Sequence, residues 1–254
     1  MFDTILCRYG EIALKGKNRI FFEKKLVENI MKCFKENKVD FDKIIRVRGR
    51  IIIKSKEKCD CLKNVFGLTS FSRAIETDLD LDKMKENSLR LYKKGSFRIS
   101  AHRINKIFLS SKELNEKVGE FIIKKKKAKV NLGKPDIDIG IEIVNNKSYV
   151  FSEKVKCLGG LPVGVTGLVS LLLQDKNSLK AGYLMLKRGC CLEIVKNKIR
   201  NKKINYNTLK KYSYGCSIKE VKKPSKKSKS LVVNDTLDNI KNYKTGLVVL
   251  RPLI

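Results

Sequence analysis

The first 75 residues begin with the hydrophobic pattern of a strand, a loop and a helix. Thr4–Arg8 is a short apolar run, and a basic loop that contains glycine follows it. Asn18 stands where a helix N-cap residue is expected. Beyond it, large apolar residues recur at the four-residue spacing that is typical of an amphipathic helix, at Phe22, Leu26, Ile30 and Phe34.

The rest of this segment predicts a hairpin, a short helix and a last strand. Two isoleucine-rich runs, Ile44–Val47 and Ile51–Ile53, flank Arg48-Gly49-Arg50 and predict the hairpin. A short helix up to Val65 and a strand at Ser70–Ile75 follow. The resulting βαββαβ order over residues 1–75 predicts a ferredoxin-like domain.

Residues 76–155 predict a second unit of helices and strands. A helix over Leu81–Tyr92 precedes a strand over Ser96–Ala101, and Ser110 and Glu113 have the spacing of a capping box. The helix behind this box has one apolar face, formed by Leu114, Val118, Phe121 and Ile122. From Ile137 to Ile143, isoleucines alternate with Asp138, Gly140 and Glu142, which predicts a half-buried strand. Asn145-Asn146 turns this strand into a partner over Tyr149–Val155.

Residues 156–254 differ in kind from the first two units. A glycine-rich stretch, 159–167, leads into an apolar run at Leu168–Leu173 and then into a helix that ends at Gly189. Between residues 196 and 229 only Glu220 is acidic, a pattern typical of a solvated, poorly ordered segment that also suits RNA. Short apolar runs at 231–233 and 247–250 predict buried strands. The whole chain therefore predicts an α+β fold.

The charge balance narrows the class of partner. Lysine and arginine outnumber acidic residues 57 to 26, and the formal net charge is +31. A lysine-rich composition can reflect genome base composition or growth at high temperature, but that bias normally raises glutamate as well. Such an excess therefore favours a polyanionic partner, of which nucleic acid is the usual one. An anionic membrane surface is the weaker alternative, because no strongly basic amphipathic helix stands out.

Targeting signals and metal motifs add little. The chain has no apolar run of about 20 residues for a membrane span, and its first residues do not resemble a signal peptide. We therefore expect a cytoplasmic protein whose eight cysteines are mostly reduced, small, buried groups. No CxxC pair occurs, and Cys59-Asp60-Cys61 lacks a matching second pair, so no metal site is predicted. His102 is the only histidine, which excludes catalytic designs that need two.

Several separated motifs follow one another in an order characteristic of one family. They are residues 8–19 (RYGEIALKGKNR), 48–50 (RGR), 65–72 (VFGLTSFS), 97–115, 135–136 (PD) and 159–164 (GGLPVG). They resemble the tRNA sulfurtransferases that make 4-thiouridine, and the match is dense over residues 1–170. The resemblance implies an N-terminal ferredoxin-like domain at 1–75 and a THUMP domain at 76–155. In that family these two domains hold the acceptor arm and 3′ end of tRNA.

The resemblance also implies a third domain at 156–254, of the nucleotide-binding α/β type called a PP-loop domain. Residues 182–189 resemble the helix that follows the family's serine-glycine-glycine-x-aspartate-serine loop, which places the loop at 173–178. Of that motif, the stretch Gln174, Asp175, Lys176, Asn177 and Ser178 keeps only the last serine. The family loop turns successive backbone N–H groups toward phosphate, which requires glycines. Because both glycines are missing and Asp175 adds a negative charge, we predict a degenerate loop and no bound ATP.

Later motifs indicate that this third domain is shortened. Residues 231–237 resemble the family's strand and turn beside the nucleotide, with an altered turn, and 250–254 resemble its arginine-proline-leucine-isoleucine element. The segment between Cys191 and Leu231 is far shorter than a full nucleotide-binding sheet requires. The family also places a reactive cysteine upstream of the late strand, and Cys216 is the candidate by position. Its surroundings match poorly and no partner thiol follows it, so a structural or exposed thiol is the favoured alternative.

Nine side chains are candidate RNA contacts: Arg8, Lys15, Lys17, Arg19, Arg50, Arg98, His102, Arg103 and Lys106. The first four flank the glycine loop and are suited to phosphate contacts. The equally weighted alternative is that this loop is only a solvated surface loop. The resemblance places 98–106 on and after a THUMP strand whose counterpart binds RNA, and strand alternation puts Arg98 and His102 opposite Ile99 and Ala101. Aromatic residues are only 7% of the chain and tryptophan is absent. Stacking on single strands is therefore expected to be secondary to recognition of shape and backbone.

These patterns lead to one main hypothesis and one alternative of another class. We expect a tRNA-binding protein that grips the acceptor arm and 3′ end, has lost ATP-dependent catalysis, needs no cofactor and presents tRNA to a separate modifying enzyme. The alternative is an active sulfurtransferase that binds ATP, adenylates a uridine and uses Cys216 as its sulfur carrier. A decaying gene product without a retained role is a third interpretation. ATP binding discriminates between the first two.

Overall fold

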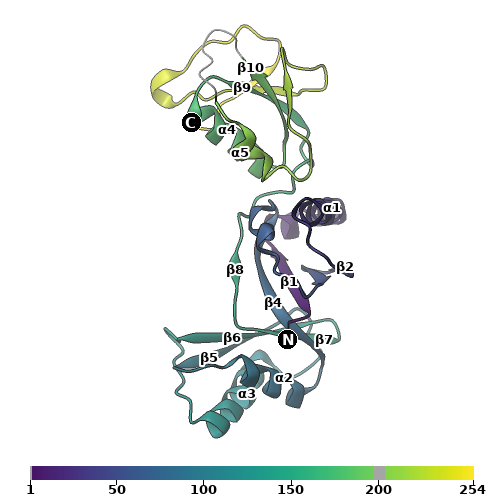
Figure 1. Ribbon diagram of the computed structural model, residues 1–254, viewed down its shortest axis with the longest axis vertical. Helices are drawn as coiled ribbons and strands as arrows, with labels where there is room; N and C mark the ends of the chain where they lie inside the picture. The colour runs from purple at the N-terminus through teal and green to yellow at the C-terminus, as the bar shows by residue number, and fades with distance from the viewer. Residues whose placement is uncertain (1, 197–203) are drawn as a thin grey trace. The chain divides into compact units, whose positions relative to one another are not determined.

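The computed structural model describes residues 2–196 and 204–254, which fall into two compact units (Figure 1). The first unit comprises the residues up to Arg8, Asp40–Lys58 and Ser70–Lys156; the second comprises Tyr9–Val39, Cys59–Thr69 and Cys157–Ile254. Both units draw on residues 1–75, so the domain boundaries after residues 75 and 155 stay a prediction. None of the helices in these described stretches is long and apolar enough to cross a membrane.

The first unit is built on a continuous sheet with the strand order β2-β3-β1-β4-β7-β6-β5. Its N-terminal strands are β1 (Thr4–Tyr9), β2 (Lys43–Val47), β3 (Arg50–Lys54) and β4 (Leu68–Asp78). β2 and β3 form the predicted antiparallel hairpin, and Gly49 takes a φ of +82° in its turn, a conformation that glycine adopts without strain. β4 is longer than predicted because it pairs with β8 near its start and with β7 near its end. It therefore joins the two halves of the sheet.

The other half of this sheet carries two helices on one face (Figure 1). Its elements are α2 (Leu81–Leu91), β5 (Phe97–Arg103), α3 (Ser111–Lys126), β6 (Ile137–Val144), β7 (Lys147–Phe151) and β8 (Val155–Lys156). β5 and β6 are parallel, so α3 serves as the crossover between them. The predicted capping box at Ser110 is confirmed: its hydroxyl accepts from the Glu113 N–H, and the Glu113 carboxylate accepts from the Ser110 N–H. The predicted strand over 149–155 is divided between β7 and β8.

One expectation about β6 is wrong. The alternation of isoleucine with polar residues predicted a half-buried strand, yet every residue from Gly140 to Val144 is buried. The isoleucines pack in a core with α2 and α3, whereas Val144 belongs to a second cluster with Leu6 and Ile52 of the N-terminal strands. β6 is therefore covered on both faces from Gly140 to Val144, and the carboxylate within this stretch is enclosed as well. Glu142 is only 5% exposed.

The helical part of the second unit follows the predicted spacing. α1 (Arg19–Asn37) buries Leu26, Ile30 and Phe34 of the four-residue pattern, whereas Phe22 is half-buried. It is preceded by the short 3-10 helices η1 (Glu11–Leu14) and η2 (Gly16–Asn18), and η3 (Asp60–Asn64) is the predicted short helix before Val65. Asn18 stands at the predicted N-cap position, but its backbone is already helical and its side chain makes no capping hydrogen bond.

The second unit also contains a parallel sheet with the order β11-β10-β9-β12-β13. Its elements are β9 (Leu168–Leu173), α4 (Lys176–Lys187), β10 (Cys191–Lys196), α5 (Asn207–Lys210), β11 (Lys219–Val221), β12 (Ser230–Val232), η4 (Leu237–Asn239) and β13 (Val248–Leu250). The prediction of a poorly ordered segment from 196 to 229 is wrong for 204–229, because buried Leu209 and Tyr214 fix this part on the core. Residues 197–203 lie outside the described residues.

Candidate nucleic-acid interface

Arg8, Arg50 and Glu142 form a buried ion triad in the first unit. Arg8 Nε donates to one carboxylate oxygen of Glu142 at 2.5 Å, and Arg50 Nε donates to the other at 2.7 Å. Arg8 also donates to the hydroxyl of Ser72, and its guanidinium lies 4.8 Å from the centre of the Phe151 ring. Burial opposes ionisation of Glu142, but the two guanidinium groups outweigh it and hold the pKa of this carboxyl below its usual value. Two cations on one carboxylate leave one excess positive charge.

The triad forms part of the wall of a cavity of about 540 Å³. Four lining side chains are cationic, namely Arg8, Arg50, Arg98 and Lys154, and three are acidic, namely Asp138, Glu142 and Glu153. The lining therefore carries one net positive charge before His102, which also lines the cavity, is counted. The predicted alternation is confirmed for Arg98 and His102, which face the cavity with Ser100, and for Ile99, which belongs to the hydrophobic core. Ala101 packs against that core but also lines the cavity.

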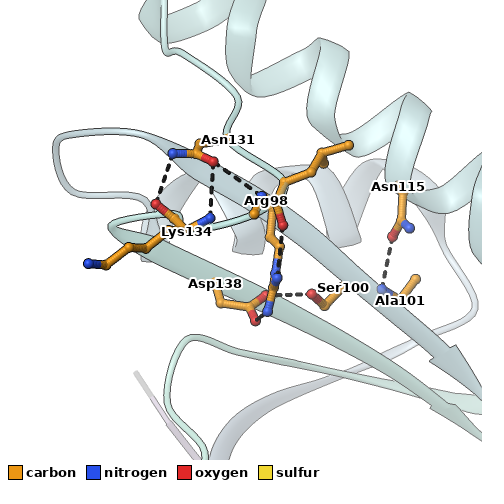
Figure 2. A network of polar contacts seen from close by, with 9 residues as sticks. Arg98, Ser100, Ala101, Asn115, Asn131, Lys134 and Asp138 are labelled. Carbon is orange, nitrogen blue, oxygen red and sulfur yellow. Dashed lines mark hydrogen bonds and ion pairs between the residues drawn. The ribbon is translucent and has the colours of Figure 1, made fainter.

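Arg98 connects the cavity to a neighbouring loop (Figure 2). One of its terminal nitrogens donates to Asp138 at 2.5 Å and the other to the Leu132 carbonyl at 3.0 Å. Asp138 also accepts from the hydroxyl of Ser100. Burial opposes ionisation of Asp138, but Arg98 and Ser100 keep the pKa of its carboxyl lowered. The loop is closed by Asn131, whose side-chain amide donates to the Lys134 carbonyl and accepts from the Lys134 N–H.

The remaining candidates of the first unit lie on β5 and beyond its end. His102 and Lys106 are exposed, and Arg103 is half-buried and donates to the Phe108 carbonyl at 3.0 Å. Arg8, Arg50, Arg98 and His102 thus meet at one cavity, whereas Arg103 and Lys106 do not line it. β5 pairs directly with β6, whereas β1 and β3 are separated from β6 in the strand order by β4 and β7. The residues of β1 and β3 reach the cavity because Arg8 and Arg50 both bind Glu142 of β6.

The basic loop of the second unit is organised by its own contacts. Lys17 is exposed, and Lys15 Nζ lies 5.3 Å from the centre of the Phe22 ring. Arg19 pairs with Glu23 at 3.5 Å, and this buried carboxylate also accepts from the Tyr9 hydroxyl. Lys15, Lys17 and Arg19 are therefore accessible or partly accessible cations close to the start of α1.

The loop before α4 is occupied by its own side chains. Asp175 is the N-cap, and its carboxylate accepts hydrogen bonds from the Asn177 N–H at 2.7 Å and the Ser178 N–H at 3.2 Å. The Ser178 hydroxyl in turn accepts from the backbone N–H groups of Gln174 and Asp175. Backbone N–H groups at a helix start are the donors that a phosphate would need. Here they already have partners, one of which is an anion.

A second buried carboxylate ties together the C-terminal motifs. Asp235 is 1% exposed and accepts from the Tyr243 hydroxyl, the Lys241 N–H and Arg251 Nε. Burial next to this carboxylate raises the pKa of Tyr243 to about 12. Arg251, the arginine of the Arg251-Pro252-Leu253-Ile254 element, is thus paired with Asp235 within the second unit.

Cys216 is joined to Cys191 in a disulfide, with 5.6 Å between the two Cα atoms. No thiol follows Cys216 in the sequence, as expected, but its partner lies upstream. The other six cysteines lie outside this bridge, which agrees with the expectation of mostly reduced cysteines. The expectation of small buried groups is confirmed for Cys7, Cys33, Cys59, Cys157 and Cys190. The two bridged cysteines are 25 residues apart and form no motif. Sequence patterns therefore gave no signal for the bond.

Comparison with known proteins agrees with the motif order. The ThiI ferredoxin-like domain family matches residues 4–72, and the THUMP domain family matches residues 80–153. A probable tRNA sulfurtransferase of Thermococcus kodakarensis is 37% identical over 238 residues, which are 85% of this chain and 62% of that protein. A probable tRNA sulfurtransferase of Mycoplasmopsis synoviae is 40% identical over 194 residues, 74% of this chain and 50% of that protein.

The chain belongs to the ThiI-like family of tRNA sulfurtransferases.

Two solved structures of similar fold support this placement. PH1313 from Pyrococcus horikoshii has a TM-score of 0.87 and 31% identity, covering 99% of this chain and 94% of that one. A 4-thiouridine synthetase, solved as an RNA complex with bound ATP, has a TM-score of 0.71 and 29% identity, covering 87% of this chain and 61% of that one. The chain spans 62% of the length of the Thermococcus kodakarensis relative and 50% of the length of the Mycoplasmopsis synoviae relative.

Sequence reasoning on this family member missed several residues of the cavity. Glu142 and Asp138 looked like the solvent side of a half-buried strand, and Phe151 and Lys154 carried no motif. One signal was available at Gly140, because a glycine inside an alternating strand indicates that another group approaches the strand backbone closely. A Cβ atom at that position would overlap the Phe151 ring. The glycine therefore marks the place where the strand is covered.

Proposed function

We propose that this chain binds tRNA, gripping the acceptor arm and 3′ end through phosphate contacts from both units. The net charge of +31 favours a polyanionic partner, and the family makes tRNA the best candidate. A related 4-thiouridine synthetase has been solved as a complex with RNA, which supports the same class of ligand. A cytoplasmic location, where tRNA is found, is part of this proposal.

The nine candidate contacts divide into two roles in this proposal. Arg8 and Arg50 act mainly by holding Glu142 and shaping the cavity, because their guanidinium groups are already committed to it. Arg98, His102 and Lys154 face the same cavity with greater exposure and contact phosphate there. Arg103 and Lys106 extend that contact beyond the end of β5. Lys15, Lys17 and Arg19 supply a further contact from the second unit.

A salt series on tRNA binding tests this grip. Contact with six or more phosphates predicts a fall in affinity of about a thousandfold or more between about 50 and 200 mM salt. The measurement is fluorescence polarisation of a labelled tRNA transcript with the whole chain. A fall of less than about tenfold would contradict the proposal. Sequencing of RNA crosslinked to the protein in cells then identifies the ligand; ribosomal RNA without tRNA would exclude the tRNA assignment.

We infer further that the loop before α4 does not bind ATP. The observation that carries this inference is the cap formed by Asp175, since its carboxylate takes the Asn177 and Ser178 N–H groups that a phosphate would need. An entering phosphate would have to displace an anion that is already bonded. Equilibrium binding of labelled ATP, measured with tRNA present, tests the inference directly. Micromolar binding at this loop would overturn it.

We propose a separate modifying enzyme as a partner of this chain. A chain that holds the acceptor arm without ATP chemistry would present tRNA to an enzyme that supplies the reaction. Co-purification of such an enzyme only in the presence of tRNA is the expected result. Recovery of tRNA alone would remove this part of the proposal and leave tRNA binding intact.

The alternative function is an active sulfurtransferase. Curated relatives carry that name, and the related synthetase was solved with bound ATP. In this alternative Cys216 carries sulfur, and its bond to Cys191 is one oxidation state of the carrier. ATP-dependent formation of 4-thiouridine in tRNA by the purified chain, given a persulfide as the sulfur donor and a thiol to reduce the Cys191–Cys216 bond after each turnover, would establish it. The loss of that activity in a Cys216→Ser variant would assign the carrier.

A further inference from the structure

The start of α1 exposes three large apolar side chains beside basic ones. Leu14 is 86% exposed, and Ile20 and Phe21 are each 56% exposed. η1, which carries Leu14, and η2 both contact α1. Large apolar side chains that are exposed together on a surface indicate a contact with a ligand or partner. Leu14, Ile20 and Phe21 are exposed within eight positions of sequence, and we call them the surface Leu14-Ile20-Phe21.

The aromatic ring of this surface is held in a fixed orientation. Phe21 stands edge-on to Phe22, with 5.5 Å between the ring centres and an angle of 85° between the planes. Phe22 is half-buried and has Lys15 Nζ 5.3 Å from the centre of its ring. Phe22 thus contacts both the Phe21 ring and a cation. A ring held in this way loses little conformational freedom when a flat partner stacks on it.

The charge around the surface identifies the partner. Residues 11–25 contain five cations, Lys15, Lys17, Arg19, Lys24 and Lys25, and two acids, Glu11 and Glu23. Glu23 is buried and already accepts from the Tyr9 hydroxyl and pairs with Arg19. Lys25 pairs with Glu28 just beyond this range. The exposed apolar groups therefore lie in a stretch of sequence with an excess of positive charge. A ligand with flat apolar faces and regularly spaced anions matches both features, which is the chemistry of unpaired nucleotides.

We propose that Phe21, flanked by Leu14 and Ile20, is a stacking surface for unpaired nucleotides of the bound RNA. One base lies against the Phe21 ring, and the adjoining phosphates contact Lys15, Lys17 and Arg19. This proposal rests on the proposed function, since it assumes that RNA is the ligand. It adds a part of the RNA that the cavity of the first unit does not recognise, namely the base faces of a single-stranded segment.

A tryptophan reporter tests the stacking directly. The chain contains no tryptophan, so Phe21→Trp introduces a single indole fluorophore, and Met31→Trp is a matched control at an exposed apolar position further along α1. The titrants are an RNA hairpin with unpaired 3′ nucleotides and the same hairpin with a blunt end. We expect quenching of Phe21→Trp by the first hairpin only, and little change in Met31→Trp. Equal quenching by both hairpins would overturn the proposal.

The affinity of Phe21→Ala completes the test. Stacking of one base on an aromatic ring predicts that this variant binds the hairpin with unpaired nucleotides about 5- to 100-fold more weakly than wild type, whereas Met31→Ala does not. Binding within about twofold of wild type, with the salt dependence retained, would refute the stacking surface and leave tRNA binding standing. No RNA binding by wild type would remove both proposals. Sedimentation identifies one further contrary outcome: a wild-type dimer that Phe21→Ala dissociates would assign this surface to a second copy of the chain.

Discussion

The guanidinium of Arg8 donates to the carboxylate of Glu142 across 134 positions of sequence, and both side chains are buried. This contact links the first strand of the chain to a central strand of the THUMP half of the sheet. Arg50 occupies the second carboxylate oxygen. The motifs Arg8-Tyr9-Gly10 and Arg48-Gly49-Arg50, which looked like independent RNA contacts, thus meet on one acidic residue. Their arginines stabilise the fold of the cavity wall before they contact any ligand.

Substitution of Glu142 should therefore destabilise the first unit strongly. Glu142→Gln leaves two guanidinium groups buried without a counter-charge, and loss of one partner from a buried ion pair costs about 3–5 kcal/mol. Urea unfolding followed by circular dichroism measures the change. Glu153→Gln, an exposed carboxylate of the same cavity, is the matched control and should change the free energy of unfolding by less than about 0.5 kcal/mol. Equal effects of the two variants would contradict this role of Glu142.

The same triad predicts a loss of stability in acid. The pKa of Glu142 is lowered in the folded chain, so its contribution is present above the unfolded pKa of about 4.3 and is lost as the pH falls through the folded value. Asp138, whose pKa is also lowered, acts in the same direction. Urea midpoints measured from about pH 7 to about pH 3 should fall at the acid end. That fall should be smaller in Glu142→Gln, which has no carboxyl to protonate at this position.

Local signals predicted much of the fold. The capping box at Ser110 depends on contacts between residues three positions apart. The apolar face of α1 depends on residues four positions apart, so both features can be derived from neighbouring positions. The alternation along β5 likewise placed Arg98 and His102 on one face. These features follow from the period of a helix or strand, which needs no knowledge of the rest of the chain.

The features that could not be predicted depend on contacts distant in sequence. Whether Glu142 faces solvent or two arginines is decided by the strands that cover β6, and the pattern within β6 is the same in either case. The ordered part of the basic segment before residue 229 depends on Leu209 reaching a core formed by other elements. It also depends on buried Tyr214, whose hydroxyl accepts from Asn37 at the end of α1. The bond between Cys191 and Cys216 likewise depends on how β10 and the segment before β11 are placed.

Lys154 should contribute to RNA binding without contributing to stability. Its exposed ammonium lines the cavity beside Asp138, and loss of one phosphate contact is expected to lower the slope of affinity against salt by about one. Lys154→Ala should therefore bind tRNA more weakly at low salt and approach wild type at high salt. Lys94→Ala, an exposed lysine of the same unit outside the cavity, is the control. A parallel shift at every salt concentration would argue against a phosphate contact.

Asp175 should act as a helix cap rather than as a ligand of nucleotide or metal. Loss of an N-cap side chain costs about 0.5–2 kcal/mol, so Asp175→Ala should lower the free energy of unfolding by about that amount. Asp175→Ser keeps an oxygen that can accept from the same N–H groups and should recover most of the loss. Addition of millimolar Mg-ATP should not raise the melting temperature of wild type. A rise in wild type that is absent from Asp175→Ala would instead show that this loop binds nucleotide.

The disulfide between Cys191 and Cys216 can be counted and then removed. Titration of thiols in denaturant, after purification without reductant, should give six per chain, and eight after reduction, because six cysteines lie outside the bridge. A bridge that closes a loop of 25 residues is expected to stabilise the folded chain by about 3 kcal/mol, since it restricts the unfolded chain. The double variant Cys191→Ser/Cys216→Ser should therefore unfold at lower urea than oxidised wild type and close to reduced wild type. Cys61→Ser, a half-buried cysteine outside the bridge, should keep the difference between oxidised and reduced protein. Eight thiols before reduction would show that the pair is a dithiol in the purified protein, and the stability difference should then be absent as well.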